Sequence, residues 1–265
     1  MDVWSLASGS SGNAYLVRSG ETLLLVECGL ALSKIVGYLA AHQVAPADLS
    51  GILLTHEHSD HSRSARQLSD AYGIPLFATQ GTLDHRTLRD SRLARLVFPD
   101  RRFSLGDLEI LPFPVPHDGR EPVGYRLASQ SGTVCVTTDL GFVPNKVIPH
   151  FRDTDLLVLE ANHDEAMLQA GPYPAFLKRR VLGNLGHLSN VATADALVAC
   201  RDRVAPRVWL AHLSQVNNSP SRAALDVSAR LAAVGLGHVD VEVARRNRPS
   251  LHWSSEPRPR QLPLF

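Results

Sequence analysis

The hydrophobic positions of the chain fall into short runs that predict many strands separated by helices. Runs typical of strands occupy positions 14–17, 22–27, 51–55, 75–78, 108–113, 124–127, 133–137, 156–159, 207–210 and 239–243. Helical periodicity occupies positions 30–42, 64–72, 81–95, 174–182, 190–201 and 221–234. The early strands are closely spaced, which favours antiparallel pairs, whereas the later strands alternate with helices. Two sheets sandwiched between helices fit both halves, so the pattern predicts an α/β fold.

Length and charge narrow the possible functions without deciding among them. The chain has 265 residues, enough for one large domain or two small ones. Its formal net charge is only +1, so any site for a polyanion has to come from local clustering of basic residues. No apolar run approaches the roughly 20 residues that a membrane span needs. The three cysteines are scattered, and the chain starts without a signal-peptide pattern. We therefore expect a cytoplasmic protein with no membrane partner.

The composition changes towards the end of the chain. From about Arg245, arginine and proline dominate. Such a segment has too few apolar residues to build a core of its own. The sequence therefore predicts one catalytic domain over residues 1–253, followed by a flexible tail over residues 254–265.

A dense group of histidines follows the apolar strand predicted at 51–55. It reads His56, Glu57, His58, Ser59, Asp60 and His61. Helix-like sequence begins soon afterwards, so these residues occupy a strand-to-helix loop in which polar side chains can converge. Imidazole and carboxylate groups are ligands for zinc, iron and manganese, and such a loop can serve two ions at once. The group predicts a metal site.

The HEHSDH segment resembles the HxHxDH signature of the metallo-β-lactamase superfamily, and further motifs follow in the same order. They are VPHD around His117, TTDLG around Asp139 and LAHLS around His212. The resemblance covers residues 3–253 and implies an αββα sandwich that holds two divalent transition-metal ions. It implies that one ion is held by His56, His58 and His117, and the other by Asp60, His61 and His212, with Asp139 shared between them.

One position departs from the superfamily pattern. The strand that ends near Val26 is followed by Glu27, where the superfamily usually has aspartate. That residue generally orients the metal loop without binding metal. Glu27 either keeps this role with a longer side chain or is a solvent-facing carboxylate at a strand end, and the sequence favours neither.

Three other motifs bear on the substrate. SGSSGN supplies Ser8, Ser10, Ser11 and Asn13, which either surround a phosphate or form an ordinary hairpin turn. EANHD supplies His163 and Asp164, which either contact substrate or cap the next helix. Upstream of the third motif, GHLSN, the residues Lys178, Arg179 and Arg180 either meet phosphates or form a solvated helix end.

His187 lies in the GHLSN motif, directly before a predicted helix. The motif resembles the histidine element of phosphodiesterase branches such as RNase Z-like enzymes, in which the histidine protonates the leaving oxygen. A plain loop histidine is the alternative. A helix N-terminus favours bound anions, which agrees with a phosphate substrate.

The motifs together resemble the YycJ/WalJ branch of bacterial metal-dependent nucleases. This resemblance implies a 5′-to-3′ DNA exonuclease acting in DNA repair or replication. In the mechanism that we expect, water attacks phosphorus beside Asp60 and Asp139, and His187 protonates the departing 3′ oxygen. The alternatives are a PhnP-type hydrolase of small or cyclic phosphodiesters and a thioester or lactam hydrolase. A purely binding role would need a degraded site, whereas all seven candidate ligands are present.

Two further segments suggest contacts with DNA or with a DNA-bound protein. Residues 81–102 carry six arginines, several of them three apart, which on a helix either follow a DNA backbone or form a solvated face. The chain ends in QLPLF, which resembles the QLxLF peptide that binds the bacterial DNA sliding clamp. The resemblance implies clamp contacts by Gln261, Leu262, Leu264 and Phe265. A tail that packs back on the domain or moves freely is the alternative.

Overall fold

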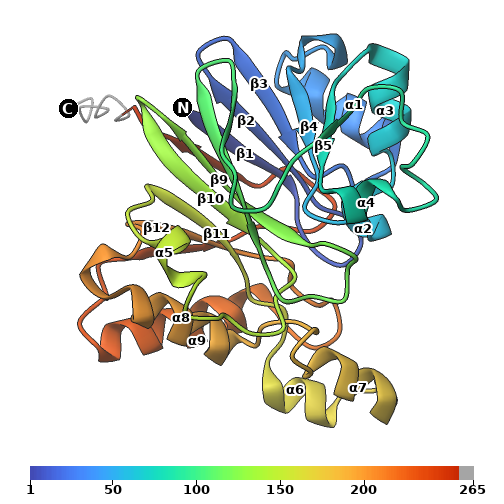
Figure 1. Cartoon of the computed structure of the whole chain (residues 1–265). Helices are drawn as coiled ribbons and strands as arrows, with labels where there is room; N and C mark the ends of the chain where they lie inside the picture. Colours follow the sequence, from blue (N-terminus) through green and yellow to red (C-terminus); the bar gives the residue numbers. More distant parts are fainter. Residues whose placement is uncertain (257–265) are drawn as a thin grey trace.

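Two facing sheets with helices on their outer sides form the molecule. The computed structural model describes residues 1–256, and the two seven-stranded sheets lie against each other like the layers of a sandwich (Figure 1). The αββα fold predicted from the sequence is confirmed. The predicted strands and helices recur within a few residues of their expected ends, with one exception described below.

The first sheet has the strand order β14-β1-β2-β3-β4-β5-β6. Its strands are β1 (Asp2–Ala7), β2 (Ala14–Ser19), β3 (Thr22–Val26), β4 (Gly51–Leu53), β5 (Leu76–Ala78), β6 (Ala94–Leu96) and β14 (Leu251–Ser254). The second sheet has the order β13-β12-β11-β10-β9-β8-β7. Its strands are β7 (Phe103–Leu105), β8 (Leu108–Pro114), β9 (Val123–Ser129), β10 (Gly132–Thr137), β11 (Leu156–Glu160), β12 (Arg207–Ala211) and β13 (Asp240–Val243).

Each sheet changes from antiparallel to parallel pairing along its width. In the first sheet β1, β2 and β3 pair antiparallel, and β3 to β6 pair parallel. In the second sheet β7 to β10 pair antiparallel, and β10 to β13 pair parallel. The two halves of the chain therefore have the same strand pattern, although no repeat is visible in the sequence by eye. The carboxyl ends of the parallel strands gather at one edge of the sandwich.

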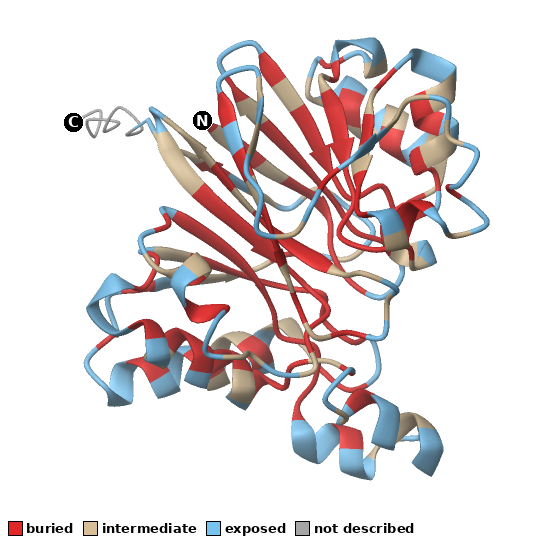
Figure 2. Cartoon of the chain, in the orientation of Figure 1, coloured by how far each residue is buried: buried red, intermediate tan, exposed pale blue. Residues whose placement is uncertain are grey.

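Alternation of side chains along the strands produces three apolar layers. On β3, Leu24 and Val26 point between the sheets and Leu25 points to the helical side; on β11, Val158 points between the sheets and Leu157 to the helical side. Strands that are buried on both faces are almost continuously apolar, as these are. Figure 2 shows the resulting buried bands between the sheets and beneath the helices.

Helices cover both outer faces. Those on the first sheet are α1 (Leu32–Ala41) and α3 (Ala65–Tyr72), and those on the second are α5 (Ile148–Phe151), α8 (Asn190–Cys200) and α9 (Pro220–Ala233). The remaining helical turns are α2 (Ser59–Ser62), α4 (Gln80–Leu83), α6 (Glu165–Ala170), α7 (Ala175–Val181), η1 (Pro46–Asp48) and η2 (Arg201–Arg203). Helices α6 and α7 lie together at the lower edge of the molecule (Figure 1).

The helix expected over 81–95 is wrong. Helix α4 ends at Leu83, and the chain continues in isolated turns. In one of these turns the amide of Leu88 donates a hydrogen bond to the carbonyl oxygen of His85, three residues earlier. The chain then forms β6, which pairs parallel with the edge of β5 that β4 leaves unpaired. The guanidinium group of Arg120 also donates a hydrogen bond to the carbonyl oxygen of Asp84. The arginines of this segment therefore do not form a row on one helix.

The C-terminal boundary differs slightly from the prediction. Strand β14 pairs with β1 and includes Ser254, one residue past the expected end of the domain. The sequence signal was weak because prolines and arginines surround this short strand. The predicted tail motif Gln261, Leu262, Leu264 and Phe265 lies outside the described residues.

Candidate metal centre

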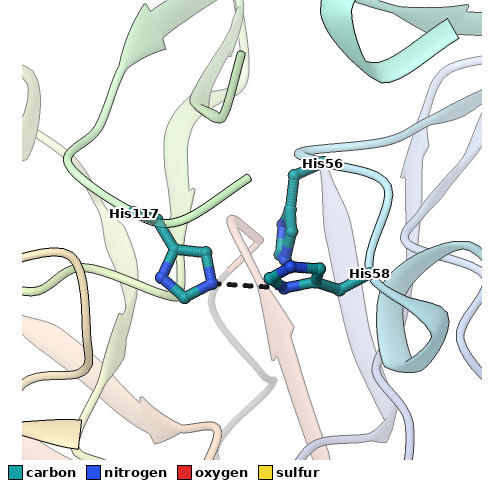
Figure 3. A group of neighbouring side chains, drawn as sticks. All are labelled: His56, His58 and His117. Atoms are coloured by element: carbon teal, nitrogen blue, oxygen red, sulfur yellow. Dashed lines mark hydrogen bonds between the residues drawn. The ribbon is translucent and has the colours of Figure 1, made fainter. Parts of the chain in front are cut away.

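Three imidazoles converge at the edge where β4 and β8 end. His56 and His58 come from the loop after β4, and His117 comes from the loop after β8 (Figure 3). The Nδ1 atom of His58 is 3.3 Å from the Nε2 atom of His117, and the ring centroids of His56 and His117 are 5.0 Å apart. One nitrogen of each ring lies within 4.8 Å of the others. A single ion fits between these three nitrogens.

A second group lies next to the first. Nε2 of His212 is 3.1 Å from Oδ2 of Asp60, and Nε2 of His61 is 3.5 Å from the same oxygen. His212 directly follows β12, whereas Asp60 and His61 lie in α2. These three residues form the second set that the sequence resemblance implied.

Asp139 connects the two groups. Its carboxylate lies 2.9 Å from Nε2 of His61 and 3.8 Å from Nε2 of His117, measured to different oxygens. The side chain is buried, and it also takes part in a cluster with His56 and His61. All seven sequence-predicted ligands are therefore brought together in one place.

The outward-facing nitrogens of these rings are held by other groups. His56 Nδ1 is 2.9 Å from Thr55 Oγ1, His117 Nδ1 is 3.1 Å from the carbonyl oxygen of Gly186, and His212 Nδ1 is 2.9 Å from Oε1 of Glu160. Such contacts fix the orientation of a ring and leave the other nitrogen for a metal. Nε2 of His56 is buried with no hydrogen-bond partner among the described residues. An imidazole and carboxylate donor set of this kind fits zinc, iron or manganese.

The electrostatics of the cluster suit a cation. Burial lowers the pKa of His56 well below its usual value, and the nearby His61 lowers it further, so His56 is neutral. Burial alone raises the pKa of Asp139, but His212 and His61 outweigh it and hold that pKa well below its usual range. Neutral imidazole and ionised carboxylate are the forms that bind metal, and His56 and Asp139 are already in these forms. Burial lowers the pKa of His61 and of His212, but Asp139 outweighs it and raises both above the usual value, so metal binding would displace a proton from each of these two rings.

The backbone at this edge is strained at three points. Glu27, Asp139 and His212 have φ values of 67°, 60° and 54°, in the left-handed region that residues other than glycine seldom adopt. Hydrogen bonds hold two of these turns: the amide of Glu27 donates to Leu53, and the amide of His212 donates to Oγ of Ser8. Strain of this kind, on the order of 1–3 kcal/mol per residue, persists where surrounding contacts over-determine it.

Glu27 holds the loop that carries His56, His58 and His61. It is buried, its Oε1 accepts a hydrogen bond from the amide of Thr55, and the same oxygen is 3.4 Å from Nδ1 of His61. The solvent-facing alternative does not hold. Gly29 nearby has no room for a side chain, since a Cβ there would lie 1.6 Å from the carbonyl oxygen of Asp60.

The SGSSGN loop is tied to the same structure. The hydroxyl of Ser8 accepts hydrogen bonds from Tyr15 and from the amide of His212. The side-chain amide nitrogen of Asn13 is 3.2 Å from both the carbonyl oxygen of Asp60 and Nε2 of His61. Ser10 and Ser11 are exposed. The structure thus places Ser8 and Asn13 against the metal residues and leaves Ser10 and Ser11 facing solvent.

His187 lies beside the seven candidate metal ligands, which together are called the metal cluster. Its Nδ1 is 2.8 Å from Oε1 of Glu160 and 3.2 Å from Oδ1 of Asp139, and part of its side chain reaches solvent. Burial lowers the pKa of His187, but Glu160 and Asp139 outweigh it and raise that pKa well above its usual value. Two residues further on, Ser189 caps α8 by accepting a hydrogen bond from the amide of Ala192. A protonated imidazole at this position can donate to a departing oxygen.

Glu160 was not singled out from the sequence. It is fully buried, it ends β11, and besides His187 and His212 it accepts hydrogen bonds from the amides of Leu140 and Leu188. Burial raises its pKa, but His187 outweighs this and lowers the pKa of Glu160 to about 2. A carboxylate at the end of a buried parallel strand, in the same place as Asp139 near the end of β10, is a signal that the sequence does contain.

The remaining predicted substrate residues are spread around the site. Asp164 caps α6 by accepting from the amide of Met167, whereas His163 is buried with neither ring nitrogen hydrogen-bonded among the described residues. Lys178 donates to a carbonyl of α6, and Arg179 is exposed.

Arg180 is paired with the loop that carries His117. Its Nε and Nη2 each donate to Oδ2 of Asp118 at 2.8 Å. The other oxygen of Asp118 is 3.2 Å from Nε2 of His117. Arg180 therefore reaches the rim of the metal cluster, although nothing in the sequence pattern distinguishes it from its two neighbours.

Comparison with known proteins agrees with this geometry. Residues 7–212 match the family model of the metallo-beta-lactamase superfamily. The chain belongs to this superfamily. It is 35% identical over 238 residues to the exodeoxyribonuclease WalJ of Streptococcus pneumoniae, with 88% of each chain covered. It is 33% identical over 240 residues to the exodeoxyribonuclease YycJ of Bacillus anthracis, covering 88% of this chain and 89% of the relative.

Solved structures with the same fold are more distant in sequence. The metallo-beta-lactamase fold protein YhfI of Bacillus subtilis superposes with a TM-score of 0.74 at 20% identity, covering 96% of this chain and all of that one. The short form of human tRNase Z gives a TM-score of 0.67 at 18% identity, covering 97% and 100%. These likenesses support the fold alone. Among residues 1–256, none of the helices combines the length and apolar character required to span a bilayer.

Proposed function

We propose that the protein is a metal-dependent DNA exonuclease that degrades single strands from the 5′ end. The similarity to the exodeoxyribonucleases WalJ and YycJ, which extends over 88% of the chain, supports a DNA substrate. The observation that carries the proposal is the position of His187. It adjoins Asp139, the residue between the two ligand groups, so a proton donor stands beside the point where a phosphodiester would be held.

The chain's ligands suit two ions. His56, His58 and His117 would hold one, Asp60, His61 and His212 would hold the other, and Asp139 would serve both. Zinc, manganese and iron are the candidates that match these donors. When bound, such ions neutralise charge on phosphate oxygens and lower the pKa of water to give a nucleophile at neutral pH.

The protein's own residues supply orientation and the proton. Glu160 accepts from Nδ1 of His187 and so fixes which nitrogen faces the substrate. His187 then donates a proton from Nε2 to the departing 3′ oxygen, whose release as an alkoxide would otherwise be unfavourable. The carboxylates of Asp60 and Asp139 accept hydrogen bonds from the attacking water and aim it at phosphorus.

Other substrate contacts belong to the same proposal. The exposed Ser10 and Ser11 can reach a 5′ phosphate, with Ser8 and Asn13 holding their loop in place. His163, directly before α6, and Lys178 and Arg179 in α7 would contact the strand beyond the cleaved bond.

The sliding clamp is the proposed protein partner. The sequence QLPLF at residues 261–265 resembles a clamp-binding peptide, and it follows the catalytic domain through a proline- and arginine-rich stretch. Docking on the clamp would bring the nuclease to replicating or damaged DNA in the bacterial cytoplasm. All seven candidate metal ligands lie within residues 56–212, so cleavage of short oligonucleotides should not need the final five residues.

A substrate panel tests the proposal. The purified protein is assayed with a labelled single-stranded oligonucleotide, with bis(p-nitrophenyl) phosphate and with a thioester, each before and after removal of metal by a chelator. We expect hydrolysis of the oligonucleotide and, more slowly, of the small diester, both lost on chelation and restored by Mn²⁺ or Zn²⁺. Turnover of the thioester alone would contradict the proposal.

A further inference from the structure

The connection between β13 and β14 carries three arginines at the edge where the metal cluster lies. Arg245, Arg246 and Arg248 fall within the seven residues that join the two sheets. Arg245 and Arg248 border a groove of about 700 Å³, and all three arginines line a smaller adjoining pocket of about 170 Å³. None of the sequence motifs described above includes these residues.

Arg246 is held in place across the SGSSGN loop. Its side-chain stem lies over Gly9, where a Cβ would be only 2.5 Å from Arg246 Cγ, and the φ of Gly9 is 150°. Glycine is therefore required at position 9 for the arginine to lie there. The Nη1 atom of Arg246 is buried and has no hydrogen-bond partner among residues 1–256. A buried guanidinium nitrogen without an acceptor lacks a hydrogen bond that an oxyanion would supply.

The three arginines bring positive charge to this edge of the molecule. Within the described part of the chain, no carboxylate forms an ion pair with Arg245, Arg246 or Arg248. Glu242 also borders the groove, but its carboxylate accepts from Arg207 at 3.1 Å and from the ring nitrogen of Trp209 at 3.3 Å. The N-terminus of α9, at Pro220, opens on the same groove and adds its positive dipole end.

Ser8 links the backbone of the arginine segment to the backbone of the ligand His212. The amide of Ser8 donates to the carbonyl of Arg245 at 2.9 Å, and the hydroxyl of Ser8 accepts from the amide of His212 at 2.8 Å. Leu213 and Ser214, the next two residues after His212, line the smaller pocket. A ligand that extends away from the metal cluster past His212 would therefore reach Arg246.

We propose that Arg245, Arg246 and Arg248 form a second phosphate-binding site, which holds a phosphate of the nucleic-acid strand next to the one being cleaved. The phosphate chemistry follows from the unpaired guanidinium groups; its assignment to a DNA strand rests on the function proposed above. Either an internal phosphodiester or a 5′-terminal phosphate supplies the same oxygens, and the experiment distinguishes them.

The test compares Arg246→Ala with Arg230→Ala. Arg230 lies in α9, ten residues from its groove end, and pairs with Asp195, so its loss removes the same charge far from the site. Steady-state rates are measured on 5′-phosphorylated and 5′-hydroxyl oligonucleotides and on bis(p-nitrophenyl) phosphate, which has no neighbouring phosphate. Arg246→Ala should raise KM for the oligonucleotide about tenfold or more, as expected for a lost charged hydrogen bond. Its rate on the small diester should equal that of the wild type.

The outcomes separate the possible sources of the phosphate. A loss on both oligonucleotides indicates an internal phosphate, and a loss confined to the phosphorylated one indicates the terminus. A plot of the logarithm of the binding constant against the logarithm of the salt concentration should also become shallower. The slope should change by about 0.7, the contribution of one phosphate contact on a single strand. Equal behaviour of Arg246→Ala and Arg230→Ala on every substrate would overturn the proposal. Because the stem of Arg246 is packed, the exposed Arg248→Ala variant is measured in parallel and should change KM in the same direction.

A binding measurement separates this site from the proposed activity. Inorganic phosphate should raise the unfolding temperature of the wild-type protein, and it should do so less for Arg246→Ala. If the wild type cleaves no DNA but shows this difference, the phosphate site stands and the exonuclease function fails. If DNA is cleaved and the difference is absent in both the binding and the kinetic measurements, the site fails and the function stands.

Discussion

The carboxylate of Glu160 accepts a hydrogen bond from Nδ1 of His187 at 2.8 Å, and the same oxygen lies 2.9 Å from Nδ1 of His212. One buried carboxylate thus orients both the proposed proton donor and a proposed metal ligand. This relationship links the metal cluster to the leaving-group side of the site.

Substitution of the proton donor should affect chemistry and leave the metal in place. His187→Ala should lower the rate on DNA by roughly 10²–10⁴-fold, the usual contribution of a general acid. The loss should shrink on bis(p-nitrophenyl) phosphate, because p-nitrophenolate departs without a proton. Rates on the two substrates and metal content measure this. Equal losses on both substrates would point to positioning or folding.

Glu160 acts through its two histidines, so its loss should be milder. Glu160→Gln should reduce activity or metal affinity about 10–100-fold, the range for groups that orient metal ligands. Part of the activity loss should disappear in a His187→Ala background, because the proton donor is already absent. Glu109→Gln, an exposed carboxylate paired with Arg102, is the matched control and should be neutral. If Glu160→Gln lowers activity by the same factor in the His187→Ala background as in the wild type, Glu160 does not act through His187.

Asp139 is the residue shared between the two ligand groups. The wild-type protein should bind about two transition-metal ions per chain, and Asp139→Ala should weaken both sites. Metal analysis after gel filtration measures this, with His187→Ala as a variant that keeps its metal. Retention of both ions and of activity by Asp139→Ala would mean that the two-metal interpretation is wrong.

The final five residues should matter for recruitment only. Burial of two or three apolar side chains of QLPLF should give micromolar affinity for the clamp, about −7 to −8 kcal/mol. Calorimetry with purified clamp compares the intact chain with one lacking residues 261–265. Binding should vanish on deletion while cleavage of short oligonucleotides is unchanged. No binding by the intact chain, or equal binding by both, would refute the docking motif.

The sequence was sufficient for the fold and for finding the candidate ligands that the structure brings together, because both are encoded locally. Strands such as β3 and β11 are continuous apolar runs, and His56 to His61 lie together in one loop. The residues that support the site were harder to find. Nothing in the sequence distinguishes Glu160 from other glutamates, and its role follows only from the pairing of β11 with β10. The role of Arg246 likewise follows only from the packing of its side chain against Gly9. The false helix at 81–95 arose because edge pairing with β5 overrode a helical pattern.

The most direct test of the exonuclease assignment compares linear with circular single-stranded DNA of the same sequence. With Mn²⁺ present, the protein should release nucleotides progressively from the 5′ end of the linear strand, faster when that end carries a phosphate, and should leave the circle intact. The circle is a strict control because its phosphodiesters are chemically the same and only the end is missing. Cleavage of the circle at a comparable rate, or no cleavage of either DNA by the metal-loaded protein, would contradict the account.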